Sequence, residues 1–145
     1  MYIKDMMTSR IVTVEMDDTL GDVREIFNKV AFHHVLVVAD NGELSGMISD
    51  RDMRHNLSPK LGTAAELQRD RDTLTLKAHQ IMTRNLITLG PDDQVFDAIA
   101  HFTQHKISAL PVLDAKGKPI GIVSWRDILQ IIVDTKSRDD FNTWI

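Results

Sequence analysis

The sequence contains one pattern twice, at an offset of 75 residues. The matched segments are Met7-Thr8 with Met82-Thr83, Asp17-Asp18 with Asp92-Asp93, Phe27 with Phe102, Gly42 with Gly117, Gly46 with Gly121, and Ser49-x-Arg51-Asp52 with Ser124-x-Arg126-Asp127. Self-similarity at a fixed period indicates one supersecondary unit used more than once. A duplicated unit commonly packs about a pseudo-twofold axis, and this creates a cleft between the copies. We therefore look for function among residues that occupy the same position in both copies.

Each copy predicts the order strand, helix, strand, strand, helix. Short β-branched runs suit the first strand, and apolar residues at helical spacing follow acidic helix-start signals. Continuous apolar runs then indicate buried strands, joined in the first copy by an Asn-Gly hairpin turn. The predicted strands are Ile11–Val14, Val35–Ala39 and Leu44–Ile48, then Leu86–Leu89, Leu110–Leu113 and Pro119–Val123; helices are predicted after Asp17-Asp18, Ser49, Pro91-Asp92-Asp93 and Ser124. The predicted fold class is α+β, with two β-α-β-β-α repeats packed about a pseudo-twofold axis.

The organisation along the chain follows from this order. We expect a first repeat over residues 1–56, a linker over 57–77, a second repeat over 78–136 and a C-terminal tail over 137–145. Charged residues and Pro-Gly punctuation mark the linker as solvated, with a helical turn or two. The tail segment Phe141–Ile145 is unusually apolar for a chain end, so we expect it to fold back on its own domain or else to contact a second subunit.

Composition excludes several classes of function. The chain has 145 residues, 43% of them hydrophobic, with a formal net charge of −4 and no cysteine. Clustered Lys and Arg are absent, so no nucleic-acid partner is expected, and disulfides, thiol nucleophiles and cysteine-ligated zinc are excluded. No run approaches the roughly 20 apolar residues of a membrane span, and Met1–Asp5 does not open a signal peptide. We expect a soluble, cytoplasmic protein with no membrane partner.

The duplicated Ser-x-Arg-Asp element allows two interpretations. Ser49 and Asp52, like Ser124 and Asp127, have the spacing of a capping box at a helix start. The same geometry offers an anion site, a hydroxyl donor and a carboxylate that can bind a ribose diol, and the neighbouring arginine is a phosphate-compatible donor. The sequence leaves both interpretations open.

Taken in order and twice, these motifs resemble the cystathionine-β-synthase (CBS) domain family, arranged as a tandem pair. The segments that carry the resemblance are Met7-Thr8, Val35–Val38, Gly46–Met53, Met82-Thr83, His105–Asp114 and Gly121–Ile128, within about residues 3–56 and 78–133. The resemblance implies a disc-like regulatory module without catalysis, whose inter-repeat cleft binds AMP, ADP or ATP, with S-adenosylmethionine ranked below these nucleotides. It implies no required cofactor, a role in energy sensing, and a separate regulated protein that receives the signal.

The resemblance also nominates the site residues. It places Ser49, Arg51, Asp52, Ser124, Arg126 and Asp127 at the ribose and phosphates, His33, His34, His105 and Lys106 on the phosphate side, and Val12, Thr13, Ile87 and Thr88 on the adenine side. The basic residues do not match between the copies, because Ser108 and Ala109 stand where the first copy has its two histidines. Phosphate contacts should therefore be unequal, and Lys106 favours the second repeat slightly.

No metal site and no catalytic centre are predicted. His33 and His34 are adjacent, so on a strand they point to opposite faces and cannot chelate one metal from one side. His101 and His105 have helical i, i+4 spacing but no following acid, which favours a solvated helix face. No nucleophile elbow, phosphate loop or dinucleotide fingerprint occurs, so we do not expect an enzyme.

These observations predict a stand-alone module that binds an adenine nucleotide and signals to a separate partner. A homodimer is expected from the resemblance, with apolar helical positions at Ile128, Leu129, Ile131 and Ile132. Two alternatives stay open. One is a structural dimerisation or scaffold module without a ligand, and the other is a small metal-dependent phosphohydrolase that uses Asp and His residues.

Overall fold

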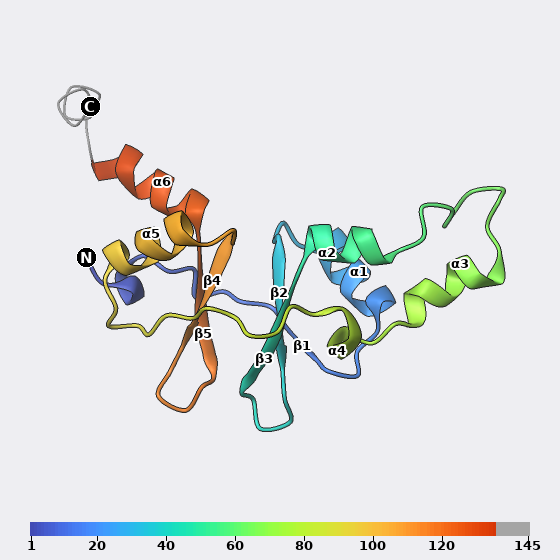
Figure 1. Cartoon of the computed structure of the whole chain (residues 1–145), viewed down its shortest axis with the longest axis horizontal. Coiled ribbons are helices and arrows are strands. Elements are labelled where there is room, and N and C mark those ends of the chain that lie inside the picture. The colour runs from blue at the N-terminus through green and yellow to red at the C-terminus, as the bar shows by residue number, and fades with distance from the viewer. Residues whose placement is uncertain (136–145) are drawn as a thin grey trace. The chain divides into compact units, whose positions relative to one another are not determined.

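The computed structural model describes residues 1–135, and the predicted tail, with Phe141–Ile145, lies outside them. Helices and strands alternate as an α+β fold (Figure 1). The elements are η1 (Ile3–Asp5), β1 (Thr13–Glu15), α1 (Leu20–Lys29), β2 (His34–Val38), β3 (Leu44–Ser49), α2 (Asp50–Asn56), α3 (Gln68–Asp72), η2 (Thr73–Thr75), α4 (Ala78–Ile81), α5 (Val95–Gln104), β4 (Ala109–Leu113), β5 (Pro119–Ser124) and α6 (Trp125–Thr135). The predicted fold class is confirmed.

The chain forms two compact units, which we name by the repeat that each contains. The first-repeat unit comprises residues 11–86 and 116–119. Its sheet has the order β1-β2-β3, with β1 parallel to β2 and β2 antiparallel to β3. Its core consists of Val14, Leu20, Val23, Val35, Val37, Ile48, Met53, Ala78 and Met82. The continuous apolar run in β2 is explained by this burial, because α1 and α2 supply core residues to the same cluster.

The second-repeat unit comprises residues 1–10, 87–115 and 120–135 of the described chain. Strands β4 and β5 pair in it, and its core consists of Ile3, Leu89, Ala98, Leu110, Val112, Val123 and Ile128. The first strand predicted at Leu86–Leu89 is wrong as a regular strand, because only Leu89 pairs, in a parallel bridge to Val112. Gly90 and Pro91 follow at once and turn the chain, and proline has no N–H to continue a ladder.

The Met-Thr segment that opens each copy pairs with the last strand of the other copy. Thr8 and Ile122 exchange two backbone hydrogen bonds of 3.0 Å, and Thr83 and Met47 do the same at 2.9 and 3.1 Å. The first ten residues therefore pack with the second repeat, and residues 78–86 pack with the first. Each compact unit thus joins segments that the sequence repeat places in different copies.

The prediction that the two recurring acidic pairs begin helices is wrong, because they close turns that precede the helices. Asp18 Oδ2 accepts from the backbone N–H of Glu15 at 2.7 Å, and the equivalent Asp93 accepts from Gly90 at 2.7 Å. Helix α1 instead begins with a capping box between Thr19 and Asp22. In α5 the carboxylate of Asp97 likewise accepts from the N–H of Gln94 at 2.8 Å. The acids recur because a tight turn precedes both helices.

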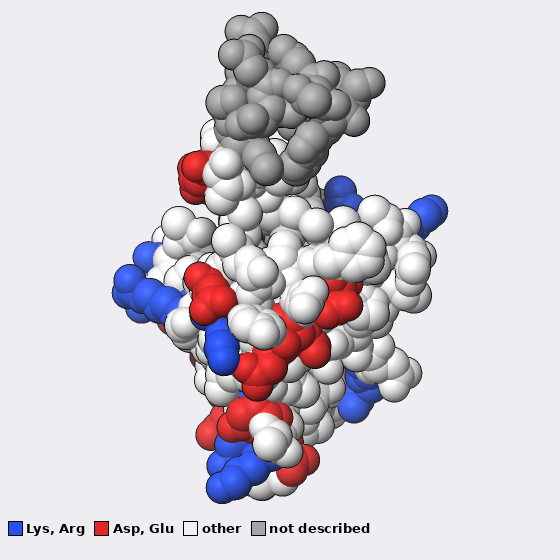
Figure 2. All heavy atoms as spheres, turned by 90° about the vertical axis from the view of Figure 1, so that its left-hand side faces the viewer, with Lys and Arg blue, Asp and Glu red and all other residues white. Residues whose placement is uncertain are grey.

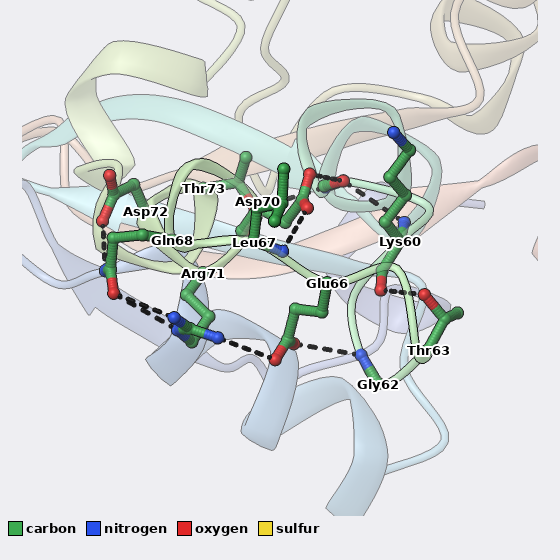
Figure 3. A network of polar contacts seen from close by, with 11 residues as sticks. Lys60, Gly62, Thr63, Glu66, Leu67, Gln68, Asp70, Arg71, Asp72 and Thr73 are labelled. Atoms are coloured by element: carbon green, nitrogen blue, oxygen red, sulfur yellow. Dashed lines mark hydrogen bonds and ion pairs between the residues drawn. The ribbon is translucent and has the colours of Figure 1, made fainter.

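The linker contains the helical turns that the sequence predicts, at α3 and η2. A network of polar contacts holds this segment together around Asp70, which is 6% exposed (Figure 3). Its carboxylate accepts from Leu67 N and from the Ser58 hydroxyl, both at 2.7 Å, and these bonds lower its pKa. Glu66 joins the ends of the loop, because it accepts from Gly62 N at 3.1 Å and pairs with Arg71 at 3.2 Å.

Exposed apolar side chains gather on one unit. Of the eight large ones among the described residues, seven lie in the second-repeat unit, namely Met1, Tyr2, Phe96, Ile99, Trp125, Leu129 and Val133; the eighth is Leu67. The prediction of Ile128 as a surface position is wrong, since it packs in the core, and Ile131 and Ile132 are half-buried. Figure 2 views the side of Figure 1 where α5 and α6 lie and shows broad uncharged surface beside gathered acidic side chains.

Within residues 1–135, no helix combines the length and the apolar character that a membrane crossing requires.

Candidate functional site: two duplicated helix starts

The Ser-x-x-Asp element of the first repeat forms a capping box at the start of α2. Ser49 Oγ accepts from Asp52 N at 3.0 Å, and Asp52 Oδ2 accepts from Ser49 N at 3.0 Å. The equivalent bonds at α6 measure 3.2 Å from Asp127 N and 2.7 Å to Asp127 Oδ2. The capping interpretation is therefore correct in both copies.

Capping uses only part of each carboxylate. In both Asp52 and Asp127 the bond goes to Oδ2, and none to Oδ1 is recorded among the described residues. Both aspartates are half-buried. A half-exposed carboxylate oxygen beside a serine hydroxyl can still accept from a ligand hydroxyl, so capping and ligand binding are compatible.

The sheet of the first repeat brings its predicted site residues toward this helix start. His34 faces Ser49 across the β2–β3 register, and Leu36 N donates to Val12 O at 3.0 Å. Thr13 pairs with Leu36 in the parallel β1–β2 register and is exposed. The predicted adenine side and phosphate side of this repeat therefore lie on adjacent strands of one sheet. In the second repeat, Ile87 and Thr88 are half-buried and precede the Leu89 bridge.

The two histidines of the first repeat have different surroundings. His33 is exposed, and its Nδ1 lies 3.1 Å from Asp50 Oδ2. His34 is half-buried, and burial lowers its pKa although Asp50 and Asp52 oppose the shift. Nothing in the motif singled out Asp50. The one available signal was the mismatch between the copies, because Trp125 occupies its position in the second repeat.

Asp50 is held as a carboxylate by its neighbours. Partial burial opposes its ionisation, but the hydrogen bond with His33, the backbone N–H of Arg51 and the charge of Arg54 outweigh burial, and its pKa is lowered. Arg54 Nη1 lies 3.7 Å from the same Oδ2 atom. A carboxylate that is paired with Arg54 therefore lies beside the histidines for which phosphate contact is predicted.

The basic residues of the second repeat lie elsewhere. His105 caps the C-terminal end of α5, where its N–H donates to His101 O at 3.0 Å, and Lys106 follows it; both are exposed. Ser108 occupies the position equivalent to His33, and its carbonyl accepts a long bond of 3.4 Å from Trp125 N. Arg126 is exposed and lies over the ring of Trp125 at 5.6 Å, and Arg51 is exposed as well.

The solvated face predicted for His101 and His105 is only partly correct. Their ring centroids are 6.1 Å apart, and His105 is exposed. His101 is half-buried, and its Nδ1 atom is buried with no hydrogen-bond partner among the described residues. No group of three His, Asp or Glu side chains suited to a metal ion occurs within residues 1–135.

The fold and the duplicated capping element define a module of two related repeats, in which a single bridge at Leu89 takes the place of the first strand in the second copy. The family model of the CBS domain matches residues 3–59 and 78–134, and the chain therefore belongs to the CBS domain family. The solved structures that share this fold are CBS domain pairs.

Relatives known by sequence differ in length. A CBS domain-containing protein of Dictyostelium discoideum is 32% identical over 133 residues, which are 90% of each chain. A homoserine O-acetyltransferase of Methanococcoides burtonii is 29% identical over 130 residues. The match spans 90% of this chain but only 24% of that enzyme. Similarity to such enzymes therefore concerns only a CBS-containing part of them.

Solved structures similar to this chain include complexes with adenosine-type ligands. CBSX2 in complex with AMP has a TM-score of 0.76, with 25% identity over 94% of this chain and 98% of that one. The CBS domain pair of protein MJ0100, in complex with 5′-methylthioadenosine and S-adenosyl-L-methionine, has a TM-score of 0.74, with 25% identity over 91% and 99%.

Proposed function

We propose that this protein is a regulatory CBS pair that binds AMP, ADP, ATP or a related adenosyl ligand and signals to a separate protein. The observation that carries the proposal is the duplicated helix start, where Asp52 and Asp127 each keep Oδ1 outside the capping box. A ribose has two neighbouring hydroxyls, and such a carboxylate can accept from them. The adenosine-type ligands in the solved CBS pairs support this choice of ligand class.

Substitution by asparagine separates ligand binding from capping. Asn retains an oxygen for the serine N–H but removes the charge and one acceptor of the carboxylate. We expect the Asp52→Asn, Asp127→Asn double variant to weaken adenosyl-ligand affinity at least about tenfold, which corresponds to about 1.4 kcal/mol. Isothermal titration calorimetry with AMP, ADP, ATP and S-adenosylmethionine measures this affinity.

The chain offers a matched control for this experiment. Asp22 and Asp97 accept from backbone N–H groups at the starts of α1 and α5, outside the proposed site. The Asp22→Asn, Asp97→Asn double variant should bind like the parent. Absence of heat with every ligand, in parent protein whose circular dichroism shows it folded, would refute nucleotide binding and favour a structural scaffold.

We also propose a homodimer that uses the apolar surface of the second-repeat unit. Val133 is 71% exposed and Phe96 is 72% exposed, on the neighbouring helices α6 and α5. The equivalent positions in the first repeat are Ser58 and Gly21. Clustered exposed apolar side chains commonly mark an association surface, so we expect the second repeats of two copies to associate.

Sedimentation across a concentration series tests the dimer. The Leu129→Asp, Val133→Asp variant should sediment as a monomer. Leu67→Asp is the control, because Leu67 is the one large exposed apolar residue among the described residues of the first-repeat unit, and it should sediment like the parent. A parent that stays monomeric at all concentrations contradicts the proposal.

We propose a regulatory and not a catalytic role. The relatives named as enzymes match this chain over about a quarter of their length, which is consistent with a regulatory part in them. A phosphohydrolase would need a metal-binding set, and the described residues contain no cluster of three suitable ligands. Metal-dependent release of phosphate from ATP that survives Asp52→Asn, Asp127→Asn would contradict this assignment.

A further inference from the structure

The first repeat carries a trio of polar side chains around Asp50 that the second repeat lacks. Asp50 Oδ2 lies 3.1 Å from His33 Nδ1 and 3.7 Å from Arg54 Nη1. The equivalent residues of the second repeat are Ser108, Trp125 and Leu129, none of which is charged. Because the two copies share one local fold, the helix start of the second repeat serves as an internal control for the effect of the Asp50 and Arg54 side chains in the first.

The backbone donors at the two helix starts differ in the same direction. At α2, Ser49 N and Asp52 N bond within the capping box, and Asp50 N donates to His33 O at 2.9 Å. These three N–H groups at the helix start are therefore used inside the protein.

At α6 the capping box is the same, but one donor is less engaged. The bond from Trp125 N to Ser108 O is 3.4 Å long, against 2.9 Å for the equivalent bond from Asp50 N to His33 O. Orphan N–H groups at a helix start favour anions. The exposed cations Lys106 and Arg126 have no carboxylate within 4.0 Å among residues 1–135.

We propose that Asp50 excludes phosphate from the first-repeat site, so that adenosine 5′-phosphates bind at the second repeat and the first repeat takes adenosyl ligands with a neutral or cationic 5′ substituent. This inference rests on the proposed function. A phosphate placed against His33 would have to compete with Asp50 for Nδ1 and would lie close to the Asp50 carboxylate, which already occupies the Arg54 guanidinium. Like-charge contact in a partly desolvated site discriminates strongly between ligands.

A charge-swap experiment on the full chain tests the proposal. AMP and adenosine are the probes, because they differ only in the phosphate, and calorimetry gives both stoichiometry and affinity. The parent should bind one AMP per chain. Asp50→Asn should add a second AMP site, or tighten a weak one at least about tenfold. Trp125→Asp should weaken the AMP site at least about tenfold, while adenosine affinity changes less than about twofold.

Asp40→Asn is the control for net charge. Asp40 is exposed in the turn after β2 of the same unit, and its substitution removes one negative charge without touching the helix start. It should leave AMP binding unchanged. Two AMP sites of equal affinity in the parent, or an Asp50→Asn variant that binds AMP like the parent, would overturn this inference but would leave the proposed function standing. A folded parent that binds neither AMP nor adenosine would refute the proposed function and the inference with it.

Discussion

Substitution of Gly46 or Gly121 by alanine is predicted to destabilise the fold, because each glycine packs against the methionine of the Met-Thr segment that pairs with its strand. We call these two segments, Met7-Thr8 and Met82-Thr83, the exchanged segments. A Cβ atom at Gly46 would lie 2.5 Å from Met82 Sδ, 2.6 Å from its Cγ and 2.9 Å from the carbonyl oxygen of Thr83. Met82 is buried in the core of the first-repeat unit, so it cannot swing into solvent. Gly46→Ala therefore forces a shift in a packed core.

The cost has two parts. Overpacking a core by one methyl group costs typically about 1–3 kcal/mol. The Thr83 carbonyl accepts from Met47 N at 3.1 Å, so moving it away weakens a backbone hydrogen bond whose net value is about 1 kcal/mol. We expect Gly46→Ala to lower the free energy of unfolding by about 1–4 kcal/mol, the sum of these two parts.

Gly121 provides the matched comparison. Its added Cβ would overlap Met7 Sδ, but the nearest backbone atom, Thr8 O, is 3.2 Å away and Met7 is only half-buried. Met7 can yield more easily than Met82, so Gly121→Ala should cost less than Gly46→Ala. Urea unfolding followed by circular dichroism measures both values, provided the transition is two-state.

A double-mutant cycle identifies the methionine as the cause. Met82→Ala alone should destabilise by about 2–5 kcal/mol, as for other buried Met truncations. Combined with Gly46→Ala, the total should fall short of the sum by at least about 1 kcal/mol, because the clash disappears with the side chain. The reasoning is refuted if Gly46→Ala lies within about 0.5 kcal/mol of the parent, or if the two substitutions add.

Two further predictions concern local hydrogen bonds. Hydrogen bonds from the Leu67 N–H and, to a lesser degree, from the Ser58 hydroxyl lower the pKa of Asp70. Its stabilising contribution is therefore present above the unfolded pKa of about 4 and is lost as the pH falls through the lower folded pKa. Asp70→Asn should narrow the difference in melting temperature between pH 7 and pH 3, and an unchanged difference would contradict this. Thr19→Ala removes the side-chain cap that accepts from Asp22 N and should lower the free energy of unfolding in urea by about 1 kcal/mol. The control substitution Thr63→Ala, at an exposed residue, should lower it by less.

The order of elements could be predicted from sequence because burial leaves a direct mark on it. The run Val35–Val38 is apolar because β2 lies between β1 and β3 inside a core, and the turn residues beside it are equally local signals. The capping boxes at Ser49 and Ser124 were predicted for the same reason, since all of their bonds lie within four residues.

The exchange of the Met-Thr segments could not be predicted. Pairing of Thr8 with Met47 and pairing of Thr8 with Ile122 would leave the same repeated pattern, because Met47 and Ile122 are equivalent positions. A sequence repeat identifies which residues correspond but not which copy each one contacts. The contact of His33 with Asp50 could not be predicted for a related reason, since neither residue recurs in the second copy.

The comparison of the copies therefore changes which residues carry functional information. Gly46 recurs because a side chain from the exchanged segment covers it, and Ser49 recurs because it caps a helix; neither recurrence requires a ligand. Recurrence is what duplication of a fold produces by itself. Duplication of the fold does not explain positions that differ between the copies while their surroundings stay the same, such as Asp50 and Trp125. We propose that the presence or absence of a charge at this position decides which ligand each helix start accepts, so the difference between the repeats is a more specific guide to function than their similarity.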